Sequence, residues 1–206
     1  MAKFFVFGDS ITYGAWDKAG GWVQRLRTFI EEKYPEEHLI YNLGISGDTS
    51  DLLLERFESE TKKRIEGKII TFIFQSGLND SAFLSTKKDF WVSQEKFRNN
   101  LREIIKISKE ISKKIFFLGI TPVDEAKTQP VAWDKRFTYK NENIKKYDEI
   151  IKEVCNVENI HFIEIFDKFF KSDYKKLLQD GLHPNSAGHE KIFEMVRDFL
   201  IKVKLI

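Results

Sequence analysis

The chain alternates between short, mainly apolar runs, several of them continuous, and longer segments in which apolar residues recur every three or four positions. Five runs, rich in β-branched and aromatic residues, occupy residues 3–7, 39–43, 69–74, 115–118 and 160–165. Strands buried on both faces have this pattern, as in a parallel sheet that is covered by helices. We therefore expect five parallel strands.

The segments between these runs have the period of an amphipathic helix. Their apolar faces comprise Trp22, Leu26, Phe29 and Ile30; Phe97, Leu101, Ile104, Ile105 and Ile111; Ile144, Tyr147, Ile150, Ile151 and Val154; and Ile192, Val196, Phe199, Leu200 and Val203. This alternation predicts an α/β fold with right-handed crossovers and helices on both faces of the sheet. Because the 206 residues fit one domain and no linker or repeat interrupts the pattern, we expect residues 1–206 to form a single domain.

Two segments that follow strands, residues 81–92 and 122–138, have neither period. Both carry aromatic residues, including Trp91 in the first and Trp133 and Phe137 in the second. Irregular segments after parallel strands often build binding sites. The alternative is that both are surface loops whose aromatic side chains pack on the core.

Clusters of small and polar residues follow four of the five runs. They are Gly8-Asp9-Ser10, Gly44-Ile45-Ser46-Gly47, Gly77-Leu78-Asn79-Asp80 and Asp180-Gly181-Leu182-His183. The carboxyl ends of parallel strands meet at one edge of a sheet, and open α/β sheets bind their ligands at that edge. The four clusters therefore predict a single site.

These clusters contain the groups that acyl transfer requires. The Ser10 hydroxyl needs a base to become nucleophilic, and His183 is suited to that task near neutral pH. Asp180, three residues earlier, can orient the imidazole of His183. The backbone N–H groups of Ser10 and Gly47 and the side-chain amide of Asn79 can stabilise an oxyanion.

Taken singly, each cluster also fits a structural role, as a tight turn, a helix cap or a buried histidine. We interpret His38 and His161, near strand starts, and His189, in the last helix, as structural. Four histidines without metal-ligand spacing or Cys partners argue against a zinc site, so we expect no metal. Gly44 and Gly47 suggest a phosphate loop, but the chain contains no G-x-G-x-x-G or G-x-x-x-x-G-K-[ST] pattern. We therefore expect no nucleotide or flavin cofactor.

Charge and cysteine usage narrow the class of protein. With 34 basic and 32 acidic residues the net charge is +2, which argues against a dedicated nucleic-acid binder. The single cysteine, Cys155, lies in an apolar helical pattern, so we expect a buried, unreactive thiol. The apolar stretch 4–7 is shorter than the core of a signal peptide, and no window resembles a membrane span. We expect a cytoplasmic location.

Together the motifs resemble those of the SGNH hydrolases, also called the GDSL esterase/lipase family. Its four blocks occur here in order and span nearly the whole chain. They are Gly8-Asp9-Ser10-Ile11, with Ile in place of the usual Leu; Gly47; Gly77-Leu78-Asn79-Asp80; and Asp180-Gly181-Leu182-His183.

This resemblance implies a three-layer α/β/α fold with a five-stranded parallel sheet in the flavodoxin-like order 2-1-3-4-5. It implies Ser10 as nucleophile, His183 as general base and Asp180 as its orienting carboxylate. Ser10, Gly47 and Asn79 would form the oxyanion hole. We expect Asp9 and Asp80 to hold the site loops through backbone hydrogen bonds, without a catalytic role.

We therefore expect a metal-independent serine esterase that cleaves carboxylic esters, or thioesters, through an acyl-enzyme. The chain looks most like the small bacterial lysophospholipase and thioesterase members of the family. A small acyl group is expected, because no long apolar loop suggests a fatty-acid channel. The alternatives are a carbohydrate O-acetylesterase, with Trp133 and Phe137 stacking on sugar rings, and a non-catalytic binding protein of the same fold.

Overall fold

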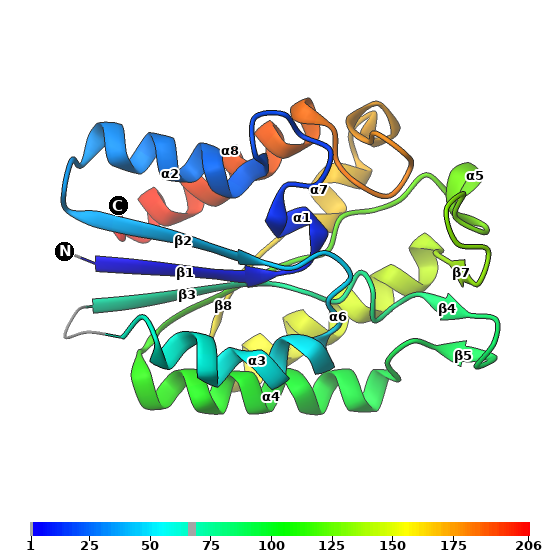
Figure 1. Cartoon of the computed structure of the whole chain (residues 1–206), viewed down its shortest axis with the longest axis horizontal. Helices are drawn as coiled ribbons and strands as arrows, with labels where there is room; N and C mark the ends of the chain where they lie inside the picture. Colours follow the sequence, from blue (N-terminus) through cyan, green and yellow to red (C-terminus); the bar gives the residue numbers. More distant parts are fainter. Residues whose placement is uncertain (1, 66–68) are drawn as a thin grey trace.

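A parallel sheet forms the centre of the computed structural model of this chain, which describes residues 2–65 and 69–206 (Figure 1). In sheet order its strands are β2 (His38–Gly44), β1 (Ala2–Gly8), β3 (Ile69–Gln75), β6 (Lys114–Leu118) and β8 (His161–Ile163), all paired in parallel. When only the five strands of this sheet are numbered along the chain, their order is 2-1-3-4-5, so the predicted topology is confirmed.

Helices cover both faces of the sheet and complete three layers. One layer contains α2 (Gly21–Lys33) and α8 (Ser186–Lys202), which pack on each other. The opposite layer contains α3 (Ser50–Lys62), α4 (Gln94–Ile111) and α6 (Asn141–Glu158) (Figure 1). Shorter helices α1 (Ser10–Tyr13), α5 (Glu125–Thr128), α7 (Phe166–Phe170) and η1 (Tyr174–Leu177) lie in the connections. Among the helices in the described ranges, none is long and apolar enough to cross a membrane.

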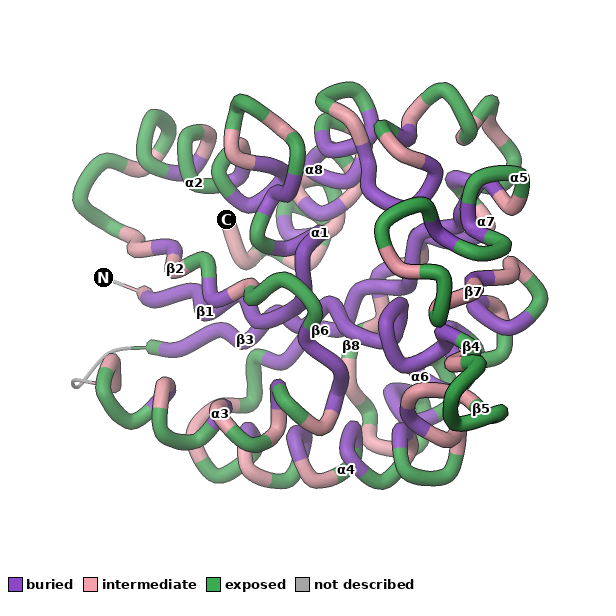
Figure 2. The backbone as a smooth tube through the Cα atoms, turned by 45° about the vertical axis from the view of Figure 1, so that its right-hand side comes forward, coloured by how far each residue is buried: buried purple, intermediate pink, exposed green. Residues whose placement is uncertain are grey.

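The central strands β1 and β3 are mainly apolar on both faces because both faces are covered. Phe4 to Phe7 of β1 are fully buried, and the tube in Figure 2 is buried along most of β1 and β3. Phenylalanine rings fill the space between sheet and helices. Phe74, for example, stacks on Phe117 at 4.8 Å between ring centroids and on Phe7 at 5.8 Å. Such packing fixes the carboxyl ends of the central strands, from which the site loops begin.

The two segments expected to be irregular form a second, small sheet. Strands β4 (Phe83–Leu84), β5 (Asp89–Phe90) and β7 (Phe137–Thr138) pair in antiparallel fashion in the order β5-β4-β7. Strands of two residues are too short to display the alternation that identifies a strand in a sequence, which is why the pattern missed them. The sheet joins both segments beyond the carboxyl ends of β1 and β3 (Figure 1).

Candidate active site

Ser10 lies directly after β1, in the first turn of α1. Asp9 is the N-cap of this helix, and its Oδ1 accepts a hydrogen bond from the Ile11 N–H at 2.9 Å. The Asn42 amide of β2 donates to the Thr12 carbonyl at 2.9 Å and ties the helix to the neighbouring strand. The Ser10 side chain is therefore presented at the carboxyl edge of the sheet from a short, firmly held helix.

Asp180 and His183 lie in a loop that is closed by a bridge between Leu178 and Pro184. Asp180 Oδ1 accepts hydrogen bonds from the backbone N–H groups of Leu182 at 2.9 Å and His183 at 2.8 Å. These bonds fix the carboxylate, so that its Oδ2 lies 2.7 Å from His183 Nδ1. The three-residue spacing thus makes this contact within one turn of the loop.

The other ring nitrogen of His183, Nε2, lies 2.9 Å from Ser10 Oγ, and both residues are buried. Burial alone would raise the pKa of Asp180, but bonds from the His183 ring and from two backbone N–H groups lower it to about 2. The ionised carboxylate can only accept, so the ring proton belongs on Nδ1 and Nε2 is free to accept from the Ser10 hydroxyl. Trp16 Nε1 also lies near Nδ1, at 3.2 Å, but the charged contact is shorter and stronger.

Gly47 and Asn79 complete the set of predicted site residues. Gly47 has a φ of +88°, and its N–H has no partner among the described residues. Asn79 Nδ2 donates to the Asp48 carbonyl at 2.8 Å, and its Oδ1 accepts from the Tyr139 hydroxyl at 3.2 Å. A carbonyl accepts only, so the Asp48 bond fixes the orientation of the amide and leaves its second N–H unused.

The buried carboxyl groups beside the site hold its loops, as expected. Asp9 caps α1, and Asp80 accepts hydrogen bonds from the backbone N–H and the hydroxyl of Ser50 at the start of α3. Burial raises the pKa of Asp9 to about 6, and burial likewise raises that of Asp80 to about 7. Neither lines the cavity described next.

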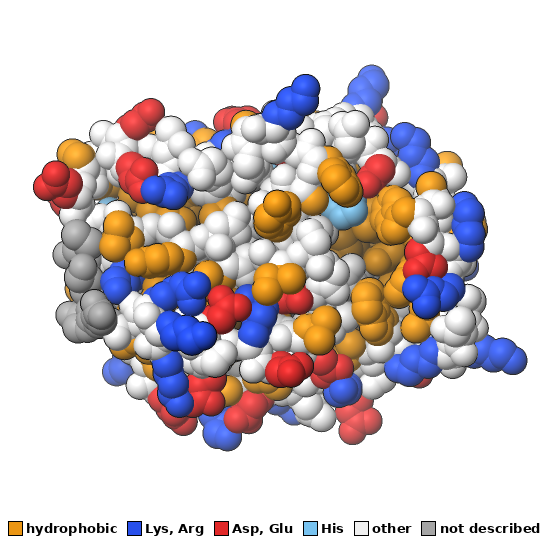
Figure 3. All heavy atoms as spheres, in the orientation of Figure 1, with side chains coloured by type: hydrophobic (Ala, Val, Ile, Leu, Met, Phe, Trp, Pro, Cys, Tyr) orange, Lys and Arg blue, Asp and Glu red, His pale blue; other side chains and the backbone are white. Residues whose placement is uncertain are grey.

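All five predicted site residues line one cavity of about 350 Å³. The other lining residues are Ala15, Trp16, Ser46, Trp91, Trp133, Asp134, Phe137, Tyr139 and Leu182. Figure 3 shows a histidine in a hollow that is bordered by hydrophobic side chains. Two of the lining tryptophans are exposed, Trp16 to 68% and Trp133 to 56%, and both rings lie within 6 Å of the His183 ring.

Known proteins share both the motifs and the fold. The family model of the GDSL-like Lipase/Acylhydrolase family matches residues 6–191. The chain belongs to this family. It is accordingly a carboxylic ester hydrolase, as the names of its relatives also indicate.

The relatives of this GDSL hydrolase are distant in sequence, and the solved structures that resemble it are close in fold. The mouse (Mus musculus) isoamyl acetate-hydrolyzing esterase 1 homolog is 22% identical over 93% of this chain and 78% of its own length. The lipase/acylhydrolase from Enterococcus faecalis superposes with a TM-score of 0.78 at 25% identity, over 97% of this chain and 95% of its own. Axe2, an acetylxylan esterase from Geobacillus stearothermophilus, gives 0.74 at 22% identity, over 98% and 93%.

Sequence patterns missed two residues that shape the site of this hydrolase. Trp16 lies in a connection without periodicity, and its contact with His183 spans 167 positions. Tyr139 follows the segment 122–138 directly and reaches Asn79 across 60 positions. Neither residue belongs to a sequence block of the family, so only their position in space indicates a role.

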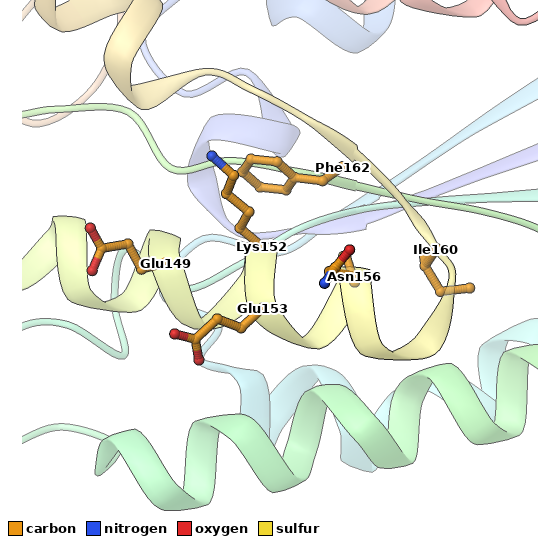
Figure 4. A pocket seen from close by; sticks show the side chains of 7 residues that line it. Glu149, Lys152, Glu153, Asn156, Ile160 and Phe162 are labelled. Carbon is orange, nitrogen blue, oxygen red and sulfur yellow. The ribbon is translucent and has the colours of Figure 1, made fainter.

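A second hollow, of about 530 Å³, lies away from these residues, along α6 and the start of β8 (Figure 4). It is lined by Glu149, Lys152, Glu153, Cys155, Asn156, Ile160 and Phe162. Burial raises the pKa of Cys155 to about 12, so this thiol stays protonated and unreactive, as expected. Within residues 2–65 and 69–206, no three His, Cys, Asp or Glu side chains gather in a way that suits a metal ion.

Proposed function

We propose that this hydrolase cleaves its ester through an acyl-enzyme on Ser10, with His183 as general base and Asp180 as the group that orients it. The observation that carries the proposal is the chain of contacts from Asp180 Oδ2 to His183 Nδ1, at 2.7 Å, and from His183 Nε2 to Ser10 Oγ, at 2.9 Å. The 2.9 Å distance suits proton transfer from the nucleophile to its base, and the 2.7 Å distance suits the hydrogen bond that orients the base.

In the first step, Ser10 Oγ forms a bond to the carbonyl carbon and its proton passes to His183 Nε2. The tetrahedral intermediate then collapses, the bond to the leaving oxygen breaks, and Nε2 returns the proton to the departing alcohol. In the second step, Nε2 takes a proton from water, whose oxygen attacks the acyl carbon. The bond to Ser10 Oγ then breaks, Nε2 returns the proton to Oγ, and the acid is released. Ionised Asp180 stabilises the imidazolium in both steps.

The proposed oxyanion hole consists of the N–H groups of Ser10 and Gly47 and the Asn79 amide. Support comes from the Gly47 N–H and the second Asn79 N–H, neither of which has a partner within residues 2–65 and 69–206. Each well-placed donor of this kind typically contributes about 3–4 kcal/mol to the stabilisation of the transition state.

A short acyl group fits this site best. The cavity of about 350 Å³ is at the small end of the usual range for ligand sites, and its volume must also admit part of the alcohol. The mouse relative is named for an acetate ester, which agrees with a small acid. We propose that acetyl and similarly short esters are the substrates.

A carbohydrate O-acetylesterase is the second candidate, because Trp16 and Trp133 leave exposed aromatic surface beside His183. The leaving alcohol must reach His183 Nε2, and both tryptophans line the same cavity as His183, so their rings are within reach of the alcohol. Indole faces stack well on sugar rings. Asp134 also lines the cavity and carries the hydroxyl-accepting oxygens that a sugar uses. Arg136 pairs with both of its oxygens, Nε with Oδ1 at 2.9 Å and Nη2 with Oδ2 at 2.6 Å. This pairing offsets the negative charge, which favours a neutral polyol over a cationic alcohol.

Hydrolysis of p-nitrophenyl esters from acetyl to palmitoyl, with Ser10→Ala as control, tests the proposal. We expect turnover that is greatest for acetyl to butyryl and is lost in Ser10→Ala. Residual turnover in Ser10→Ala would refute the proposed nucleophile. No turnover by the wild type, together with no labelling of Ser10 by a fluorophosphonate, would indicate a non-catalytic binding protein.

A comparison at constant acyl group separates the two candidates. Isoamyl acetate and acetylated xylobiose release the same acid but different alcohols. A carbohydrate esterase favours the sugar ester, and Trp133→Ala then lowers kcat/KM for the sugar ester while sparing isoamyl acetate. Equal losses on both substrates would argue against a sugar subsite.

A further inference from the structure

Arg56 of α3 connects the strand ends around the proposed oxyanion hole. Its side chain is 14% exposed and its guanidinium lies over the Phe7 ring, 5.5 Å from the ring centroid. Nη2 donates to the Leu43 carbonyl at 2.8 Å and to the Gly8 carbonyl at 3.2 Å. These carbonyls belong to the last two residues of β2 and the last residue of β1, so one side chain holds the ends of two adjacent strands.

The same guanidinium also holds the loop that follows β2. Arg56 Nε donates to Asp48 Oδ2 at 2.7 Å, and Asp48 is itself buried. Asp48 directly follows Gly47, and its main-chain carbonyl is the acceptor that fixes the Asn79 amide at 2.8 Å. By holding Asp48 in place, Arg56 therefore helps to position the peptide of Gly47 and the side chain of Asn79.

The three proposed oxyanion donors come from three separate segments, after β1, β2 and β3. Arg56 contacts the first two segments directly and reaches the third through the Asp48 carbonyl. A planar guanidinium can donate in several fixed directions at once, which the single ammonium of lysine cannot reproduce. Hydrogen bonds to a developing oxyanion depend steeply on position, so the spacing of these segments determines the catalytic rate.

We propose that Arg56 is a positioning residue, which sets the spacing of the Ser10, Gly47 and Asn79 donors without touching the substrate. The inference rests on the proposed function, since it assumes that these three groups bind the oxyanion. It predicts a defect in the transition state rather than in substrate binding.

The test compares Arg56→Lys and Arg56→Met with the wild type on p-nitrophenyl acetate. We expect kcat to fall about 10–100-fold in both variants, with KM within about threefold of the wild-type value. Removing one oxyanion donor lowers kcat by about 10²–10³, and misplacing the donors should cause part of that loss. Inhibition by a boronic acid, whose tetrahedral adduct on Ser10 uses the same donors, should weaken in parallel with kcat/KM.

Arg64 provides the matched control. It also lies near an aromatic ring, Tyr41, and its Nη1 donates to the Glu60 carbonyl at 2.7 Å. Its own carbonyl accepts from Lys3 at the start of β1, so Arg64 lies at the opposite end of the strands from the site. Arg64→Met should lower the melting temperature without changing kcat or the affinity for the boronic acid.

Chemical rescue distinguishes positioning from a general loss of structure. Millimolar methylguanidine should restore part of kcat to Arg56→Ala and none to Asn79→Ala. If folded Arg56→Met keeps wild-type kcat while Ser10→Ala is inactive, the role of Arg56 is refuted and the proposed function stands. If Ser10→Ala remains active, the proposed function itself fails.

Discussion

Replacement of Asn79 by alanine tests the proposed oxyanion hole most directly. The substitution removes the one side-chain donor of the three, whose amide is oriented by the Asp48 carbonyl at 2.8 Å and the Tyr139 hydroxyl at 3.2 Å. Loss of one such donor costs about 3–4 kcal/mol in the transition state, or about 10²–10³ in kcat. We expect little change in KM, because the bond strengthens as charge develops on the oxygen.

The same substitution also affects stability, and the structure gives the size of that effect. It leaves the Asp48 carbonyl and the buried Tyr139 hydroxyl without their partner. An unsatisfied buried group costs about 1–3 kcal/mol, so the two together destabilise the fold by about 2–6 kcal/mol. Rates should therefore be measured well below the melting temperature of the variant.

Asn100→Ala is the matched control for this loss of stability. Asn100 is another buried asparagine, and its amide donates to Ser50 Oγ and to Asp51 Oδ1, both at 2.8 Å. It does not line the cavity. We expect a comparable fall in melting temperature with kcat within about threefold of the wild type.

Steady-state kinetics on p-nitrophenyl acetate, together with thermal melts, decides between the two effects. The reasoning is wrong if Asn79→Ala and Asn100→Ala lose the same small factor in kcat. It is also wrong if Asn79→Ala raises KM while kcat is unchanged, because the amide would then bind the ground state.

Two further predictions concern titratable groups. Asp180→Asn should lower kcat about 10³–10⁴-fold with the fold intact, because an amide no longer holds the ring proton on His183 Nδ1; a loss below tenfold contradicts this. Burial raises the pKa of Asp80 from 3.8 to about 7. Between these two pH values Asp80 is protonated in the folded state and ionised in the unfolded state, so the free energy of unfolding falls as pH rises. The melting temperature of the wild type relative to Asp80→Asn should therefore be higher at pH 5 than at pH 8, and a constant difference would show that Asp80 does not titrate in this range.

Much of the fold could be predicted from local patterns. Runs such as 3–7 and 69–74 are apolar at every position except Lys3 and Thr71, because helices cover both faces of β1 and β3 and burial on two faces leaves no polar alternation. The order of the strands came instead from the family resemblance. The sheet β5-β4-β7 escaped prediction, since strands of two residues carry no period.

Some residues of the candidate site could likewise be predicted from the sequence, and others could not. The sequence by itself determined which residue types follow each strand, and with them Ser10, Asn79 and the local pair of Asp180 and His183. This was possible because parallel strands carry their carboxyl ends to a common edge, and because Asp180 and His183 meet within one turn.

Only the tertiary structure decided what holds and surrounds those groups. Tyr139 reaches Asn79 across 60 positions, Arg56 joins the ends of β1 and β2, and Trp16 lies beside a histidine 167 positions away. Each contact depends on how helices and loops pack against the sheet, and a residue gives no local sign of a partner that is brought to it by packing. The pattern of a chain therefore specifies its elements and its local pairs, while three-dimensional packing determines the geometry of the proposed oxyanion donors and the walls of the cavity.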